Sequence, residues 1–148
     1  MLSITASVLC LATNLYFEGR GEDALGQYAI AEVTLNRVAS DRYPDTICSV
    51  VKQGRVDQHG NPIKHKCHFS WYCDGLSDVP KDREAWKRAV LMAQVSIDSF
   101  RHHDTFRAVG RHAHHYHTTS IKPPYWAASM VRGRTIGGHI FYEDKTNG

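Results

Sequence analysis

The chain has 148 residues, of which 42% are apolar and 22% are charged, and this length predicts one domain over residues 1–148. The composition excludes a disordered or collagen-like chain, and no apolar run approaches the roughly 20 residues of a membrane-spanning helix. Lysine and arginine number 18 against 15 acids, a net charge of +3. This mild excess favours an anionic partner, such as a cell-wall polymer or a nucleic acid, without selecting one.

The first residues are apolar but lack the features of a secretory signal. No lysine or arginine precedes the apolar stretch, and Leu9 before Cys10 is too large for a lipoprotein-type cleavage site. We therefore expect a protein made in the cytoplasm without a signal peptide.

Three helices are predicted in the first hundred residues. The first covers residues 3–17, with Ser3 as its cap and Gly19 and Gly21 ending it. Its apolar positions recur at helical spacing: Ile4, Val8, Leu11 and Leu15. The second helix covers residues 23–38 and has a wide apolar stripe.

A long loop is expected over residues 39–66, with a polar surface excursion at 53–66. The third helix follows, with Asp82 as its cap and a 3.6-residue apolar period that continues to Phe100.

The end of the chain is rich in aromatic and β-branched residues. Residues 112–119 and 135–143 are predicted as strands, separated by a helical turn near residues 126–131. Helices followed by a small sheet indicate an α+β fold, mostly helical, with a short antiparallel sheet toward the C-terminus.

Glu18 continues the apolar face of the first helix, because it lies three residues after Leu15 and seven after Leu11. Desolvation there, together with the negative end of the helix dipole, would raise the carboxyl pKa. A carboxyl group that stays protonated is what general acid catalysis needs. A glutamate at a helix end is also an ordinary surface residue, and periodicity alone does not decide between the two.

Glu22 is expected in or just before the first turn of the second helix, where its carboxylate would stabilise free backbone donors. Arg20 could pair with either glutamate.

Histidines and cysteines cluster in two places, and zinc accepts both residue types. The spacing lacks a C-x-x-C or H-E-x-x-H motif. Strand alternation places His115 and His117 on one face and Tyr116 on the other. The clusters comprise His59, His65, His68, Cys67 and Cys73, and then His112, His114, His115 and His117. The four cysteines could be reduced buried thiols, or one disulfide could join two of Cys48, Cys67 and Cys73 outside the cytoplasm.

An aromatic run at residues 69–72 is a second candidate patch. Trp71 on a loop could hold a sugar ring while Ser70 bonds its hydroxyls, or Phe69 and Trp71 could simply close the core.

Six blocks in order resemble the SleB/CwlJ-type cell-wall hydrolases, the spore-cortex-lytic enzyme family, over nearly the whole chain. They are NLYFEGRGE (14–22), GQYAIAEVTLNRV (26–38), YPDTICSVV (43–51), CHFSWYCDG (67–75), AHHYHTTSIKPPYWAASM (113–130) and IGGHIFYE (136–143). Departures include Gly19, where the family has alanine, and His68 and His114, where it more often has glutamine and threonine.

The resemblance implies a lysozyme-like, lytic-transglycosylase-like domain with Glu18 as its one catalytic glutamate. It would cleave the MurNAc–GlcNAc bond of peptidoglycan glycan strands and form 1,6-anhydro-MurNAc, without a metal or other cofactor. Expected substrate-binding residues are Glu22, Ser70, Trp71, Tyr116, His117 and Trp126. We expect a monomer that binds no nucleic acid, inserts into no membrane and acts on the bacterial wall, with a phage origin open.

Two other functions remain open at this point. One is a zinc-dependent peptidoglycan amidase or peptidase built on the histidine and cysteine clusters. The other is a glycan-binding domain that has lost its chemistry.

Overall fold

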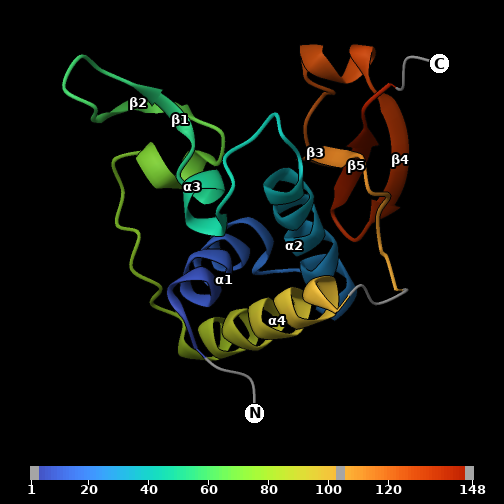
Figure 1. The fold of residues 1–148 in the computed structure, drawn as a ribbon, viewed down its shortest axis with the longest axis horizontal. Coiled ribbons are helices and arrows are strands. Elements are labelled where there is room, and N and C mark those ends of the chain that lie inside the picture. Colours follow the sequence, from blue (N-terminus) through green and yellow to red (C-terminus); the bar gives the residue numbers. More distant parts are fainter. Residues whose placement is uncertain (1–3, 103–105, 146–148) are drawn as a thin grey trace.

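The computed structural model describes residues 4–102 and 106–145. Figure 1 shows the long helices in the lower part of the molecule, a small sheet on one side and a projecting hairpin on the other. The elements in chain order are α1 (Ala6–Gly19), α2 (Ala24–Ala39), α3 (Ile47–Val51), β1 (Gly54–Val56), β2 (Pro62–Cys67), η1 (Ser70–Cys73), α4 (Arg83–Arg101), β3 (Ala113–Thr118), η2 (Tyr125–Ser129), β4 (Val131–Ile136) and β5 (His139–Glu143). The α+β class with a short antiparallel sheet is confirmed.

The helix caps explain where the long helices begin. Thr5 caps α1 by accepting from the Val8 amide at 3.2 Å, whereas the expected cap, Ser3, lies outside the described residues. Asp23 caps α2 and Asp82 caps α4, the latter as expected. Because α1 continues to Gly19, Glu18 lies inside its last turn rather than beyond it.

The predicted loop at residues 39–66 is wrong in part. It contains α3 and the antiparallel pair β1–β2. The five residues of α3 are mostly β-branched, which does not favour a helix, and a single turn is too short to show a helical period. The hairpin lacks the apolar alternation that marks a half-buried strand.

The predicted strand at residues 135–143 is two strands. Gly137 has φ of +56° and turns the chain between β4 and β5, a conformation that glycine adopts at little cost. The sheet order is β3-β5-β4, with both pairs antiparallel. One face of the sheet packs on the helices, as Phe141 in the main core shows.

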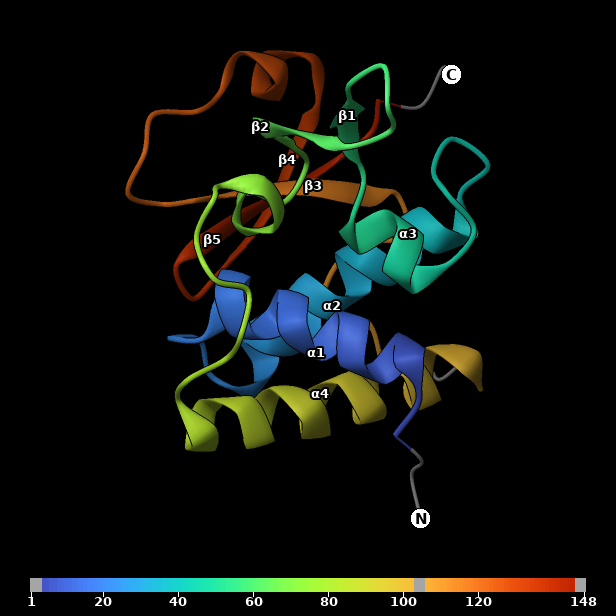
Figure 2. The same ribbon diagram turned by 90° about the vertical axis from the view of Figure 1, so that its left-hand side faces the viewer.

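The main core lies among α1, α2 and α4, which pack together, and Figure 2 shows α1 running alongside α4. Alanines on α4, among them Ala89 and Ala93 with no exposed surface, let that helix approach α1 closely. In the described residues, no helix is both long and apolar enough to cross a membrane.

Candidate active site

Glu18 is partly buried in the last turn of α1, after the fully buried Leu11 and Leu15. Burial raises the pKa of its carboxyl group above the ordinary value, and the Tyr116 hydroxyl and the Arg37 guanidinium lower it in part. The desolvation expected from the helical spacing is therefore confirmed. A carboxyl group with a raised pKa keeps its proton to higher pH than an exposed glutamate does, a property that general acid catalysis uses.

Buried polar side chains lie next to Glu18. The Trp71 indole N–H donates to Asn14 Oδ1 at 2.9 Å. The Tyr116 hydroxyl is directed at the Glu18 carboxyl group, and the Asn14 amide nitrogen is directed at that hydroxyl. Neither pair of atoms meets the geometry of a hydrogen bond. Burial and then the Glu18 charge raise the pKa of Tyr116 well above its ordinary value. Tyr116 is therefore neutral, with its hydroxyl facing the Glu18 carboxyl group.

Arg37 of α2 supplies a buried positive charge near Glu18. Its side chain is 6% exposed, and its guanidinium lies 5.2 Å from the Tyr43 ring centre and 5.1 Å from that of Phe69. Nε donates to the His114 carbonyl at 2.8 Å, while Nη1 has no hydrogen-bond partner among the described residues. The guanidinium opposes the rise in the Glu18 pKa.

Sequence reasoning missed Arg37 and Asn14 as site residues. Both are polar residues within otherwise apolar helix faces, and a buried polar side chain of that kind needs a partner. A polar residue at an apolar position of the helical period was therefore the sequence signal that could have identified both residues.

Tyr116 and His117 are separated by the alternation of β3. Tyr116 packs against Phe141 of the main core. His117 instead contacts Trp126 and bonds the Tyr142 hydroxyl at 2.9 Å, and His115 also contacts Trp126. The expected alternation is confirmed, so His117 and Trp126 lie across the sheet from Tyr116 rather than with it.

His115 is neutral in this setting. Burial, and then the positive charge of Arg37, lower its pKa to about 4.

Trp71 is mostly inside the core. It is 8% exposed, and its ring stacks on Phe17 with centres 5.1 Å apart. The core-closing alternative therefore describes Trp71 and Phe69, while Ser70 is exposed at the start of η1. The little exposed ring of Trp71 does not offer the sugar platform that the sequence suggested.

Glu22 has a different role from the one expected. Asp23, not Glu22, accepts from the first turn of α2. Glu22 Oε1 instead accepts from the Gly138 amide at 2.9 Å and lies 2.7 Å from His139 Nδ1. Glu22 therefore links the connection between α1 and α2 to the turn between β4 and β5 through these hydrogen bonds. Arg20 pairs with neither glutamate and donates to the Tyr16 hydroxyl at 2.6 Å.

Comparison with known families decides what this arrangement belongs to. Residues 21–142 match the family described as Cell Wall Hydrolase. The chain belongs to the cell wall hydrolase family. The matched stretch begins just after Glu18 and contains Arg37 and Tyr116.

The hydrolase is similar to curated spore cortex-lytic enzymes. Over 131 residues, 88% of the chain, it is 47% identical to one from Bacillus cereus and 30% identical to one from Halalkalibacterium halodurans. These alignments cover 42% and 33% of the relatives, so the chain spans less than half the length of either.

Two solved structures share its fold. The catalytic domain of the germination-specific lytic transglycosylase SleB from Bacillus anthracis matches with a TM-score of 0.64 and 26% identity, over 95% of this chain and 97% of that one. The SleB catalytic domain from Bacillus cereus matches with a TM-score of 0.59 and 27% identity, over 95% and 93%.

The cysteines of this cell wall hydrolase form two disulfides, Cys10–Cys48 and Cys67–Cys73. The reduced-thiol alternative is therefore wrong for this structure, and the bond between Cys10 and Cys48 was not among the expected pairs. No cysteine is free to bind zinc as a thiolate. Among residues 4–102 and 106–145, no three histidine, cysteine or acidic side chains are grouped as metal ligands would be.

Proposed function

We propose that this cell wall hydrolase cleaves the MurNAc–GlcNAc bond of peptidoglycan as a lytic transglycosylase. The observation that supports it most is the raised pKa of Glu18, caused by its burial at the end of α1. The SleB-like fold and the relatives' description as spore cortex-lytic enzymes support peptidoglycan as the substrate class.

In the proposed reaction, Glu18 acts first as acid and then as base. Its proton passes to the glycosidic oxygen as the bond from that oxygen to C1 of MurNAc breaks. The 6-hydroxyl of the same sugar then bonds to C1 and gives its proton to the Glu18 carboxylate. This closes a 1,6-anhydro ring, restores the acid and consumes no water.

The residues around Glu18 suit both halves of this cycle. Burial favours the protonated acid needed at the start, whereas Tyr116 and Arg37 favour the carboxylate left after proton transfer. The burial effect is the larger one, so the net pKa of Glu18 is raised, while Tyr116 and Arg37 limit the rise; general acid–base catalysis is most efficient when the pKa of the acid lies near the working pH.

The disulfides bear on where the enzyme works. Disulfides persist in oxidising surroundings and are rare in reducing cytosol. We propose that the protein acts on the wall outside the cytoplasm, where Cys10–Cys48 and Cys67–Cys73 would remain oxidised.

Mass spectrometry of the products released from purified peptidoglycan tests the reaction. We expect muropeptides ending in anhydro-MurNAc, one water lighter than reducing-end products. Reducing-end products would mean hydrolysis by water instead, and free stem peptides would mean that an amide bond was cut; either result contradicts the proposal.

Substitution of Tyr116 by phenylalanine should move the pH profile. The hydroxyl lowers the Glu18 pKa, so its loss raises that pKa and keeps the acid protonated to higher pH. The alkaline limb of kcat against pH should shift upward, and the maximal rate should fall about tenfold because the carboxyl group is less well oriented. Tyr125→Phe is the control, since Tyr125 is 95% exposed. A profile that only drops, without moving, would show that Tyr116 does not act through Glu18.

A further inference from the structure

The positive charge of the protein is concentrated in one hairpin. Residues 52–68, here called the cationic hairpin, contain β1 and β2 and carry four cations, Lys52, Arg55, Lys64 and Lys66, against the single acid Asp57. The rest of the chain has fourteen cations and fourteen acids. The whole net charge of +3 therefore lies in this segment.

The cationic hairpin has no place in the hydrophobic core. Its strands β1 and β2 project from the body at the end of the molecule opposite α4 (Figures 1 and 2), whereas Lys52 caps the end of α3. None of its residues belongs to the buried clusters of the described chain. Its four cations are exposed and form no ion pair with a described acid.

The one acid of the hairpin is used inside its turn. Asp57 Oδ1 accepts from the amides of His59 and Asn61 at 2.8 and 2.9 Å. It therefore closes the turn and forms no ion pair with a described cation.

The base of the hairpin is held by specific features. A Cβ at Gly54 would lie 2.7 Å from the Cys67 Cα, so only glycine allows the two strands to meet there. The His68 amide donates to the Gln53 carbonyl at 2.9 Å, and the Cys67–Cys73 disulfide joins the end of β2 to η1. Since η1 carries Ser70 and Trp71, the hairpin has a fixed place beside the candidate active site.

We propose that the cationic hairpin binds an anionic phosphodiester polymer of the cell wall. Such a polymer repeats one negative charge along its length, so it can contact several lysines at once and release counterions as it binds. Lysine suits it as a strongly charged contact that phosphate accepts without strict geometry. Peptidoglycan stem peptides match less well, because they carry amines beside their carboxylates. Only the choice of a wall polymer rests on the proposed function.

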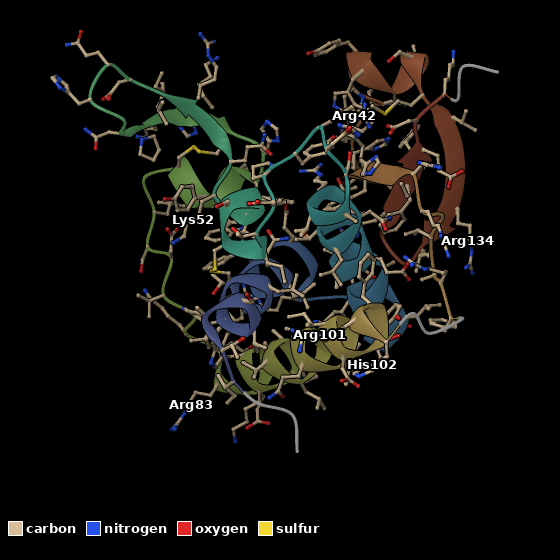
Figure 3. The ribbon with its side chains drawn as sticks, viewed as in Figure 1. Arg42, Lys52, Arg83, Arg101, His102 and Arg134 are labelled. Carbon is tan, nitrogen blue, oxygen red and sulfur yellow. A yellow bond between two sulfur atoms is a disulfide. The ribbon has the colours of Figure 1, made fainter. Side chains whose placement is uncertain are left out.

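The test measures binding in a variant that cannot digest its target. The Glu18→Gln protein and its Lys64→Gln/Lys66→Gln derivative are sedimented with Gram-positive cell walls, before and after extraction of the phosphodiester polymer, at several salt concentrations. The matched control replaces Arg83 and Arg88 of α4 by glutamine, which removes the same charge from the opposite end of the molecule, where Figure 3 shows Arg83.

On intact walls, we expect the lysine variant to bind roughly 10- to 30-fold more weakly. The slope of log Kd against log salt should fall by about 1.4, for two lost phosphate contacts. The arginine control should match its parent, and extraction of the polymer should remove the difference between the variants.

Two results would overturn the proposal. If the lysine variant loses as much binding on extracted walls as on intact walls, the hairpin binds peptidoglycan carboxylates instead. If it loses no binding on intact walls, the charged side chains of the hairpin contact only solvent. Muropeptide release by the protein with native Glu18 is scored separately, so a failure of the proposed reaction cannot be mistaken for a failure of the hairpin.

Discussion

Glu18→Gln is expected to reduce muropeptide release by about 10⁴-fold, the upper part of the range for a lost general acid or base. Glutamine keeps the shape of the side chain but cannot donate the proton that the leaving oxygen needs. It also cannot take the proton of the 6-hydroxyl. Because one residue is proposed for both transfers, no second carboxylate can compensate.

The same substitution should leave the protein at least as stable at neutral pH. Burial raises the pKa of Glu18 in the folded state, so the folded protein holds this proton above the pH at which the unfolded chain loses it. Stability therefore falls as pH rises through that window. Glutamine removes this contribution, and thermal unfolding from about pH 4 to 8 should show the wild type losing stability relative to the variant.

Glu84→Gln is the matched control for both measurements. Glu84 lies exposed in the first turn of α4, where it pairs with Lys87 at 3.5 Å. Exposed pairs of this kind contribute little to stability, and Glu84 is not among the groups that shift the pKa of Glu18. Wall lysis retained by Glu18→Gln, with this control unchanged, would remove Glu18 from the mechanism.

The sequence predicted the parts of the site that depend on local periodicity. Glu18 could be placed on a buried helix face because Leu11 and Leu15 fix that face, and Tyr116 could be separated from its histidine neighbours by strand alternation. Asp82 could be named as a cap from its position before an apolar period. All of these depend on residues within a few positions of each other.

The contacts that surround Glu18 could not be predicted in this way. Asn14 and Tyr116 are distant in sequence and meet only because β3 packs against the helices. Arg37 lies within an apolar helix, where periodicity treats it as an exception. Trp71 is a residue type that often stacks on sugar rings, but in the structure its ring stacks on Phe17 and belongs to the core. The four cysteines permit three pairings, which sequence cannot rank.

The Cys10–Cys48 disulfide should be the main covalent contribution to stability. It joins α1 to α3 across a sequence separation of 38 residues, and in the chain-entropy description a loop of that length stabilises a fold by about 4 kcal/mol. Cys10→Ala/Cys48→Ala should therefore lower Tm by about 8–16 °C for a protein of this size. The measurement is thermal unfolding followed by circular dichroism.

Cys67→Ala/Cys73→Ala is the internal comparison, because that bond closes a separation of only 6 residues and should contribute about 2 kcal/mol. Its loss should lower Tm by about half as much, yet it should weaken wall binding and activity more, since it releases the cationic hairpin from η1 beside the site. The first pair should show the opposite balance, with a large change in Tm and near-normal activity below the transition. Equal stability losses in the two variants would mean that strain or residual structure in the unfolded chain, rather than loop length, governs how these disulfides act.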